Sequence, residues 1–331
     1  MKPDITMISF DVTTKCNLNC NHCRTERLGE ELSTGQVFVI IDEVAKLKPQ
    51  FIALTGGEPF TRKDLREIVG RVKNHNICVQ INTNSLLVEE PFLKELCTTY
   101  GIDYIQVSLD GLKDIHEQYR HQGNFEKTIE KMKMISRYTK LIINTTVSRL
   151  NIDNLYSMGE FLFDEQQINC YVWGFKRLVP TNDFGKEHYL RKEDLAKLTA
   201  IWNELAQKYK GKVQVKTDIP QKNVLIKDKV KAIMEKHNLC LAGCAAANSS
   251  LTVKANGDVA PCTIIPMSVG NLFKQSAEEI LATPLMQNLI KRENLEGKCG
   301  SCENIIICGG CRATAYALTG NILGEDGACY I

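Results

Sequence analysis

Apolar and polar positions alternate along the first half of the chain in two rhythms. Short runs rich in β-branched residues predict strands at residues 5–12, 51–56, 78–84, 104–111, 141–148 and 170–178. Longer amphipathic stretches predict helices near residues 34–48, 63–74, 89–100, 125–138 and 154–163. The pattern therefore describes six units, each opening with a strand and most continuing into a helix.

Strands joined by helices of this length predict an α/β fold with a parallel sheet and right-handed crossovers. Six units are too few for the closed eight-unit form, so we expect a partial (β/α)6 barrel of the TIM type. Functional residues of such barrels lie where strands end. The sharpest polar motifs do follow strands: a cysteine triad after the first, TGGEP after the second, NTN after the third and SLDG after the fourth.

The organisation changes beyond the sixth predicted strand. An amphipathic stretch over residues 191–211 predicts a helix that packs against the barrel. Pro220 and a lysine-rich run to Lys236 follow, and from Cys240 onward cysteine-anchored turns replace regular periodicity, as expected where metal clusters replace an apolar core. We expect a barrel domain at residues 1–211, a bridging region at 212–239 and a small cysteine-rich domain at 240–331.

Composition excludes several classes of function. The 41 Lys and Arg against 39 Asp and Glu give a net charge of +2, which offers no electrostatic case for binding nucleic acid or an anionic membrane. No uncharged apolar run approaches the roughly 18 residues of a membrane span, and Asp4 lies where a secretory signal needs apolar residues. We expect a cytoplasmic protein, whose 14 cysteines are metal ligands or reactive thiols rather than disulfides.

Cys16, Cys20 and Cys23 form the frame CxxxCxxC in a short polar loop. This spacing does not match zinc sites, whose ligands come as CxxC pairs or with histidines. A cubane iron–sulfur cluster takes four thiolates, so three leave one iron open for a non-protein ligand. His22 is an alternative fourth ligand, but its position inside so tight a loop favours covering the cluster.

With GGEP one unit further along, this triad resembles the radical S-adenosylmethionine (radical SAM) superfamily. The resemblance implies that the three thiolates hold a four-iron, four-sulfur ([4Fe-4S]) cluster, that SAM chelates the open iron, and that electron transfer to SAM releases a 5′-deoxyadenosyl radical. Ser85 stands where relatives commonly have glycine after Thr-Asn. The cofactor-binding residues that the resemblance implies are His22, Gly56, Gly57, Glu58, Pro59, Asn84, Ser108 and Arg120.

Eight further cysteines lie between Cys240 and Cys329. Their spacing resembles the SPASM extension, a C-terminal module with two auxiliary [4Fe-4S] clusters. If Cys240 does not bind, its cluster keeps an open iron for substrate. A zinc ribbon over CGSCENIIICGGC is the alternative, because two CxxC pairs are the usual zinc signature. The resemblance assigns one cluster to Cys299, Cys302, Cys308 and Cys329, and the other to Cys244, Cys262 and Cys311 with Cys240 as the expected fourth ligand.

Three cysteines remain after these assignments. We expect Cys78, at the start of a strand, and Cys97, on a helix, to be small buried apolar residues. Cys170 opens the sixth predicted strand. A hydrogen-donating thiol there is the one catalytic candidate that the sequence offers.

The sequence gives weaker evidence about the substrate than about the family. RLVPTND at 177–183 and GGCRATAYALTGNILGED at 309–326 look most like maturases of ribosomally made peptides and like tetrapyrrole decarboxylases of the haem pathway. We predict oxidative modification of a peptide, and the tetrapyrrole enzyme is the alternative. Lys176, Arg177 and Arg191 would then meet its carboxylates. A sulfatase maturase is less favoured, because Thr263 replaces the aspartate of those relatives.

The expected partners are a peptide or small-molecule substrate and an external electron donor of the flavodoxin or ferredoxin type. A separate leader-binding protein is also expected, since the first predicted strand begins at Ile5. Three [4Fe-4S] clusters predict about twelve irons per chain, and the auxiliary clusters would accept the electron from the oxidised substrate. An iron–sulfur electron-relay protein without radical chemistry is the alternative from another class, against which the open triad and GGEP argue.

Overall fold

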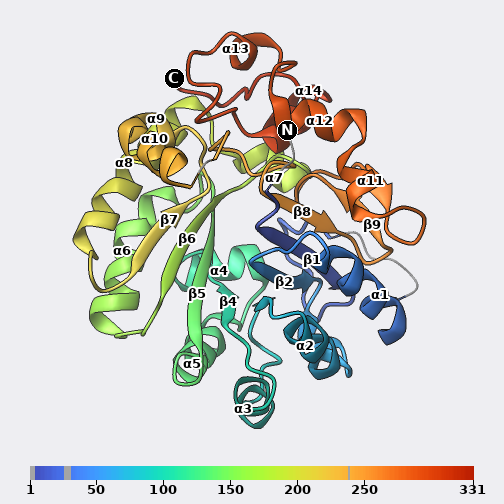
Figure 1. Cartoon of the computed structure of the whole chain (residues 1–331). Coiled ribbons are helices and arrows are strands. Elements are labelled where there is room, and N and C mark those ends of the chain that lie inside the picture. Colours follow the sequence, from blue (N-terminus) through green and yellow to red (C-terminus); the bar gives the residue numbers. More distant parts are fainter. Residues whose placement is uncertain (1–3, 26–30, 238) are drawn as a thin grey trace.

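The computed structural model describes residues 4–25, 31–237 and 239–331 (Figure 1). Its strands form one sheet in the order β10-β9-β8-β1-β2-β3-β4-β5-β6-β7. Within this order, each strand from β8 through β1 and on to β7 pairs in parallel with the next. Strand β9 instead runs antiparallel to both β8 and β10. The strands are β1 (Met7–Thr13), β2 (Phe51–Gly56), β3 (Cys78–Thr83), β4 (Tyr104–Ser108), β5 (Lys140–Val147), β6 (Val172–Arg177), β7 (Gln214–Thr217), β8 (Ser250–Val253), β9 (Asp258–Ala260) and β10 (Gly270–Asn271).

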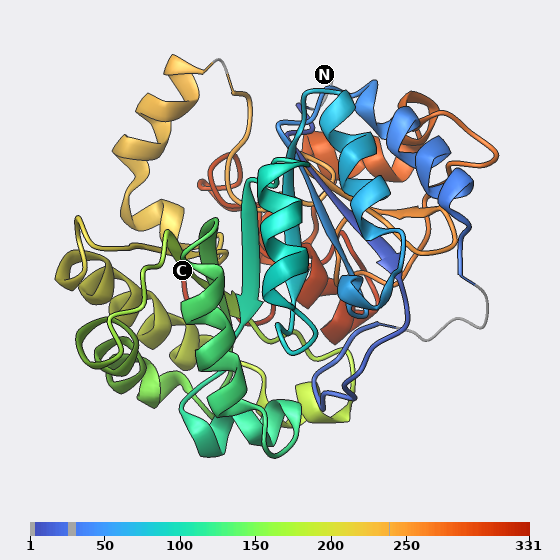
Figure 2. The same ribbon diagram turned by 90° about the horizontal axis from the view of Figure 1, so that it is seen from below.

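Helices surround the outer face of the parallel strands, as the view from below shows (Figure 2). The partial barrel and the cysteine-rich C-terminal part are confirmed, and among the described residues no helix is both long and apolar enough to cross a bilayer. The helices are α1 (Thr34–Ala45), α2 (Leu65–Asn74), α3 (Glu90–Thr98), α4 (Lys113–Arg120), α5 (Phe125–Ile135), α6 (Leu155–Gly159), α7 (Asp183–His188), α8 (Lys192–Lys208), α9 (Lys222–Leu225), α10 (Lys227–Lys236), α11 (Ala277–Leu281), α12 (Pro284–Lys291), α13 (Gly297–Gly300) and α14 (Arg312–Thr319).

The two faces of β6 show how the barrel separates its core from its interior. Trp173 points outward and meets Phe163, with ring centroids 5.4 Å apart, in the apolar layer between strands and helices. Side chains alternate along a strand, so Gly174 and Lys176 face the interior. The strand register places Ser108, Asn144, Gly174 and Lys216 in one row across that inner face.

Hydrogen bonding crosses both predicted domain boundaries. β7 belongs to the predicted bridging region and β8 to the predicted C-terminal domain, yet they pair with β6 and β1 of the barrel. One sheet thus spans both boundaries. The division at residues 211 and 239 stays a prediction. The helices α4 and α7 were not predicted, because eight and six residues are too few to show a helical repeat of apolar positions.

Candidate active site

The loop after β1 carries Cys16, Cys20 and Cys23. The Leu18 amide donates to the Cys16 sulfur at 3.4 Å, and the Cys23 amide donates to the Cys20 carbonyl at 3.1 Å. Burial raises the pKa of Cys20 to about 11. Arg120 opposes this increase, whereas the other two thiols add to it. Cys20 is therefore within electrostatic reach of both partners in the triad.

The GGEP motif lies directly against this loop. The amide of Gly57 donates to the Thr13 carbonyl and that of Glu58 to the Lys15 carbonyl, both at 2.8 Å. A methyl group on Gly57 would lie 2.1 Å from the Lys15 oxygen, and Gly56 adopts a φ of +118°. The two glycines therefore allow the end of β2 to lie beside the cysteine loop.

Glu58 is fully buried between the ends of β2 and β3. Its Oε1 accepts the Thr83 hydroxyl at 2.7 Å and the Phe60 amide at 3.2 Å, and its Oε2 accepts the Asn84 amide at 2.8 Å. Burial raises the pKa of Glu58 to about 7 against the effect of these donors. Pro59 opens the short 3₁₀ turn that Glu58 caps.

Asn84 connects the end of β3 to the cysteine loop. Its Nδ2 donates to Asn17 Oδ1 at 2.8 Å and lies 3.9 Å from the Cys16 sulfur. Ser85 follows with a φ of +70°, and its buried hydroxyl has no hydrogen-bond partner among the described residues. This left-handed conformation gives the physical reason why glycine suits the position.

Helix α4 places Arg120 beside the cysteines. Its Nε donates to Asp110 Oδ2 at 2.6 Å, its Nη1 lies 3.9 Å from the Cys20 sulfur, and its Nη2 lies 3.4 Å from His22 Nε2. The Asp110 side chain has no exposed surface, and its Oδ1 accepts the Thr146 amide at 2.8 Å. Burial lowers the pKa of His22 to about 4, which keeps the ring neutral near pH 7.

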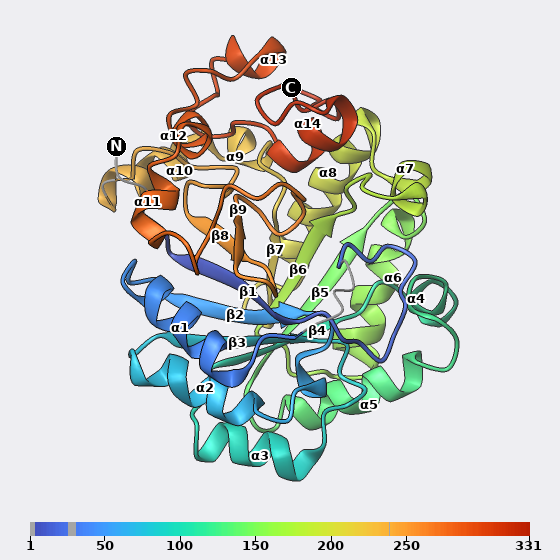
Figure 3. The ribbon, with the colours of Figure 1, turned by 90° about the vertical axis from the view of Figure 1, so that its right-hand side faces the viewer.

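Two short helices hold the loop from the side (Figure 3). The Asn21 amide donates to the Tyr119 carbonyl of α4 at 3.0 Å. Asn182, the N-cap of α7, donates from Nδ2 to the carbonyls of Asn21 at 3.0 Å and Cys23 at 3.5 Å. Phe184 of α7 lies edge-on to the Tyr119 ring, with centroids 5.3 Å apart. These contacts of α4 and α7 with the cysteine loop were not predicted from the sequence, although Asn182 lies in the RLVPTND segment singled out there.

Arg24 extends the site toward the C-terminal cysteines. Its guanidinium pairs with Asp11 of β1 at 3.2 Å. Burial favours the neutral form, but Asp11 and, more weakly, the thiols of Cys262 and Cys23 hold the pKa of Arg24 above its ordinary value. A fixed positive charge is therefore within reach of both groups of cysteines.

Several C-terminal cysteines lie within electrostatic reach of one another. Burial raises the pKa of Cys308 to about 12, and the thiols of Cys329 and Cys299 add to this increase. Burial also raises the pKa of Cys262, and the Cys244 thiol adds to that shift. The amide of Cys244 also donates to the carbonyl of Cys308, a member of the other predicted set, at 3.0 Å. The two ligand sets, and iron binding by them, stay predictions.

The other three predicted ligands differ in their surroundings. The Asn304 amide donates to the Cys302 sulfur at 3.4 Å, and the Cys311 amide donates to Asp326 Oδ2 at 2.8 Å. Cys240 is exposed. Its assignment as a fourth ligand rests on the sequence alone.

Two buried arginines lie among these cysteines and were missed by sequence reasoning. Arg292 and Arg312 are each 3% exposed. Arg292 donates to the Cys244 carbonyl at 3.1 Å, and Arg312 donates to the Cys299 sulfur at 3.4 Å. A cluster closed by four thiolates is negatively charged, and buried guanidinium groups offset such charge. The signal that would have located Arg312 is its position directly after Cys311.

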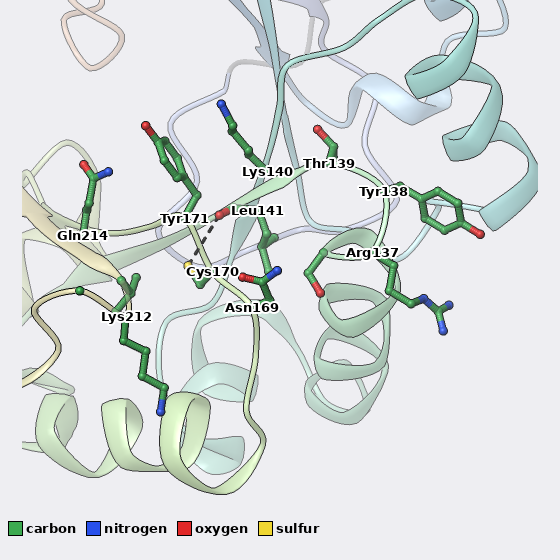
Figure 4. Close-up of a pocket in the computed structure, with 13 residues that line it drawn as sticks. Arg137, Tyr138, Thr139, Lys140, Leu141, Asn169, Cys170, Tyr171, Lys212 and Gln214 are labelled. Carbon is green, nitrogen blue, oxygen red and sulfur yellow. Dashed lines mark hydrogen bonds between the residues drawn. The ribbon is translucent and has the colours of Figure 1, made fainter.

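Cys170 lies at the opposite, amino-terminal end of the strands (Figure 4). Its thiol donates to the carbonyls of Val172 at 3.1 Å and Leu141 at 3.7 Å, beside a pocket of about 650 Å³. Burial raises the pKa of Cys170 to about 12. The structure therefore does not bring this catalytic candidate together with the cysteine loop.

The expectation that Cys78 is buried is wrong. Cys78 is exposed at the first position of β3, where the strand emerges from a solvent-facing turn, and Cys97 on α3 is half-buried.

The chemistry of the predicted donor sets, all of them thiols, fits iron–sulfur clusters. Among residues 4–25, 31–237 and 239–331, no three His, Cys, Asp or Glu side chains form a group that could hold one metal ion. The thiolates of a cubane each bind a different iron, so they surround the cluster rather than converge. Asn84 and Arg120 beside the triad, and Arg312 beside Cys299, supply the surrounding donors that such a cluster needs.

Comparison with known proteins places both parts of the chain. The model of the Radical SAM superfamily matches residues 10–162, and that of SPASM, an iron–sulfur cluster-binding domain, matches residues 244–303. The AdoMet-dependent heme synthase of Methanosarcina barkeri is 30% identical over 98% of this chain and 95% of its own length. The PqqA peptide cyclase of Granulibacter bethesdensis is 27% identical over 96% of this chain and 85% of its own.

The fold agrees with these matches. The crystal structure of Streptococcus suis SuiB bound to precursor peptide SuiA has a TM-score of 0.80 at 16% identity, covering 99% of this chain and 76% of SuiB. The two family models match in the order that the cysteine motifs predict, and a relative at 30% identity spans nearly the whole chain. SAM and iron–sulfur clusters are therefore the cofactors of this protein. The chain belongs to the radical SAM superfamily and is an enzyme of its SPASM-containing branch.

Proposed function

We propose that Cys16, Cys20 and Cys23 hold a [4Fe-4S] cluster whose open iron binds SAM, and that the enzyme oxidises a carbon atom of a ribosomally made peptide. The gathering of three thiols in one loop against the GGEP backbone carries this proposal. SAM bound in this way and reduced by one electron supplies a 5′-deoxyadenosyl radical, which removes hydrogen from the substrate.

The residues around the loop bind and orient SAM in this proposal. Gly56 and Gly57 bring the end of β2 against the loop, so that Glu58 and Asn84 stand beside Cys16. Arg120 is held by the buried Asp110, which fixes the guanidinium before any ligand arrives. The remaining proposed contacts are Pro59, Ser108 and the neutral ring of His22.

Lysines on the inner face of the barrel support a substrate that carries a carboxylate. Lys176 and Lys216 face the interior from β6 and β7, and Lys176 lies 3.9 Å from Asp218. Burial lowers the pKa of Lys222 to about 8; Asp218 opposes this shift, and the other two lysines add to it. Three lysines around a single aspartate favour an anionic group, such as an acidic side chain of a peptide.

A tetrapyrrole decarboxylase of the haem pathway is the second candidate. The 30% identity to the AdoMet-dependent heme synthase, over nearly the full length of both chains, favours it. Carboxylates of a tetrapyrrole would meet the same inner lysines. Of the basic residues predicted for this role, Arg177 is buried against Asp326 at 2.7 Å and Arg191 is the N-cap of α8, so Lys176 is the one that faces the interior.

We further propose that two auxiliary [4Fe-4S] clusters accept the electron released on oxidation of the substrate. The enzyme would work in the cytoplasm with an external flavodoxin or ferredoxin as donor. For a peptide substrate, a separate leader-binding protein would present it. The proposed auxiliary ligands are Cys240, Cys244, Cys262, Cys299, Cys302, Cys308, Cys311 and Cys329.

Anaerobic reconstitution tests the cluster assignment. Wild-type protein is expected to hold about twelve irons and to form 5′-deoxyadenosine with dithionite and SAM. The variant with Cys16→Ala, Cys20→Ala and Cys23→Ala is expected to keep about eight irons and to form none. Eight or fewer irons in the wild type would contradict the ligand count. Full iron loading without 5′-deoxyadenosine would leave an electron relay as the function.

Mass spectrometry of candidate substrates then separates the two proposed classes. The reconstituted enzyme is incubated with peptides encoded by short reading frames beside its gene and, separately, with iron coproporphyrin III. A mass change in a peptide, with one 5′-deoxyadenosine per oxidised site, supports the first proposal. Loss of carboxyl groups from the porphyrin, with peptides unchanged, supports the second.

A further inference from the structure

Asp326 is a fully buried carboxylate between the barrel and the C-terminal cysteines. It follows α14 and forms an ion pair with Arg177 at the end of β6, with Nη2 and Oδ2 at 2.7 Å and Nη1 and Oδ1 at 3.5 Å. The side chains of the pair are 4% and 0% exposed. Neither prediction from sequence nor the proposed reaction uses Asp326.

This single residue contacts predicted ligands of both auxiliary clusters. Its Oδ2 accepts the amide of Cys311 at 2.8 Å, and its own amide donates to the sulfur of Cys299 at 3.4 Å. Gln221 donates to Oδ2 at 2.9 Å and also hydrogen-bonds the thiol of Cys329. Cys311 belongs to one predicted ligand set, and Cys299 and Cys329 belong to the other.

The charges of this buried group act on any electron that reaches the clusters. An added electron is disfavoured next to a carboxylate and favoured next to a guanidinium, and burial keeps water from screening either effect. Hydrogen bonds to cluster sulfurs change reduction potentials in the same way. The Arg177–Asp326 pair therefore links the end of β6 electrostatically to predicted ligands of both clusters.

We propose that Asp326 is a positioning residue shared by the two auxiliary clusters, which orients Cys311 and Cys299 and whose charge, balanced by Arg177, sets the reduction potentials of both. The inference rests on the proposed ligand assignment. It adds a residue of this chain that decides how readily the clusters take up an electron.

Redox titration followed by electron paramagnetic resonance tests the proposal. The full chain carries Cys16→Ala, Cys20→Ala and Cys23→Ala, so that only auxiliary clusters contribute a signal. Asp326→Asn keeps the shape and removes one negative charge, and both auxiliary potentials are expected to become more positive. Adding Arg177→Gln removes the opposite charge as well, and the potentials are expected to return toward wild type. Glu293→Gln, an exposed carboxylate after α12, is the matched control and is expected to change nothing.

The possible outcomes separate this inference from the proposed function. A wild-type chain without auxiliary iron would contradict the ligand assignment. Loaded clusters with unchanged potentials in Asp326→Asn would overturn the role of Asp326 alone. If Asp326→Asn folds but loses auxiliary iron, the single variant Arg177→Gln separates the two explanations, because it keeps the bond between the Asp326 carboxylate and the Cys311 amide. Retained iron then supports positioning by Asp326, and equal loss of iron overturns it.

Discussion

The backbone amide of Asn84 donates to Oε2 of Glu58 at 2.8 Å and so connects the end of β3 to the end of β2. The bond is buried, and burial raises the pKa of Glu58 from 4.5 to about 7. The folded state therefore prefers the protonated form. The contribution of Glu58 to stability is complete below pH 4.5 and is lost as the pH rises to about 7.

We expect Glu58→Gln to reduce this dependence on pH. The free energy of unfolding of the metal-free protein, measured by denaturant titration, should fall less between pH 4.5 and pH 7 than that of wild type. The amide offers one oxygen to three donors, so the variant should also be less stable by about 1–3 kcal/mol. Glu90→Gln, on the exposed side of α3, serves as the control and should follow wild type. An unchanged pH profile in Glu58→Gln would refute the prediction.

Gly57→Ala should displace the cysteine loop. The added methyl would lie 2.1 Å from the Lys15 carbonyl, which is backbone and cannot rotate away. We expect a stability loss of about 1–3 kcal/mol and a loss of 5′-deoxyadenosine formation, read together with iron content. Gly35→Ala is the matched control, because a methyl there meets nothing within 4 Å on α1. Wild-type activity in Gly57→Ala would show that the close approach is not needed.

The same loop shows what a single sequence can and cannot predict. The periodic strands place GGEP, Asn84 and Ser108 at strand ends, and the rule that such ends share one edge predicts that they approach the cysteines. Contacts with the cysteine loop are seen for Gly57, Glu58 and Asn84. Helices α4 and α7 are too short to show a helical repeat of apolar positions, so their hydrogen bonds to Asn21 could not be predicted. Arg177 was predicted to meet substrate, yet its partner Asp326 lies 149 residues away. Contacts between such distant residues leave no periodic trace.

Ser85→Gly should stabilise the protein. Ser85 holds a φ of +70° and a buried hydroxyl without a partner, both of which cost free energy. We expect a gain of about 0.5–1 kcal/mol by thermal unfolding, since glycine removes the strain and the unpaired hydroxyl at the cost of some chain entropy. Gly123→Ser is the reverse control: φ is +80° in open space, and the change should destabilise. A lower melting temperature for Ser85→Gly would mean that the hydroxyl has a use.

Asp110→Ala should lower the free energy of unfolding far more than the loss of an exposed ion pair does. It leaves the Arg120 guanidinium, whose side chain is only 11% exposed, without its buried carboxylate, which costs about 3–5 kcal/mol. Glu95→Gln, which breaks an exposed pair with Arg66, should cost about 0–1 kcal/mol. Denaturant titration of both variants measures the contrast. Similar losses would indicate that Arg120 finds another partner.

Strand β8 reaches back across the chain to pair with β1. During synthesis β1 emerges early, but one of its edges stays open until residues 250–253 have left the ribosome. The support beneath the first cysteine loop is therefore complete only when residues 250–253 have paired with β1. Delivery of iron and sulfide to a finished site has to wait until this distant strand has been made.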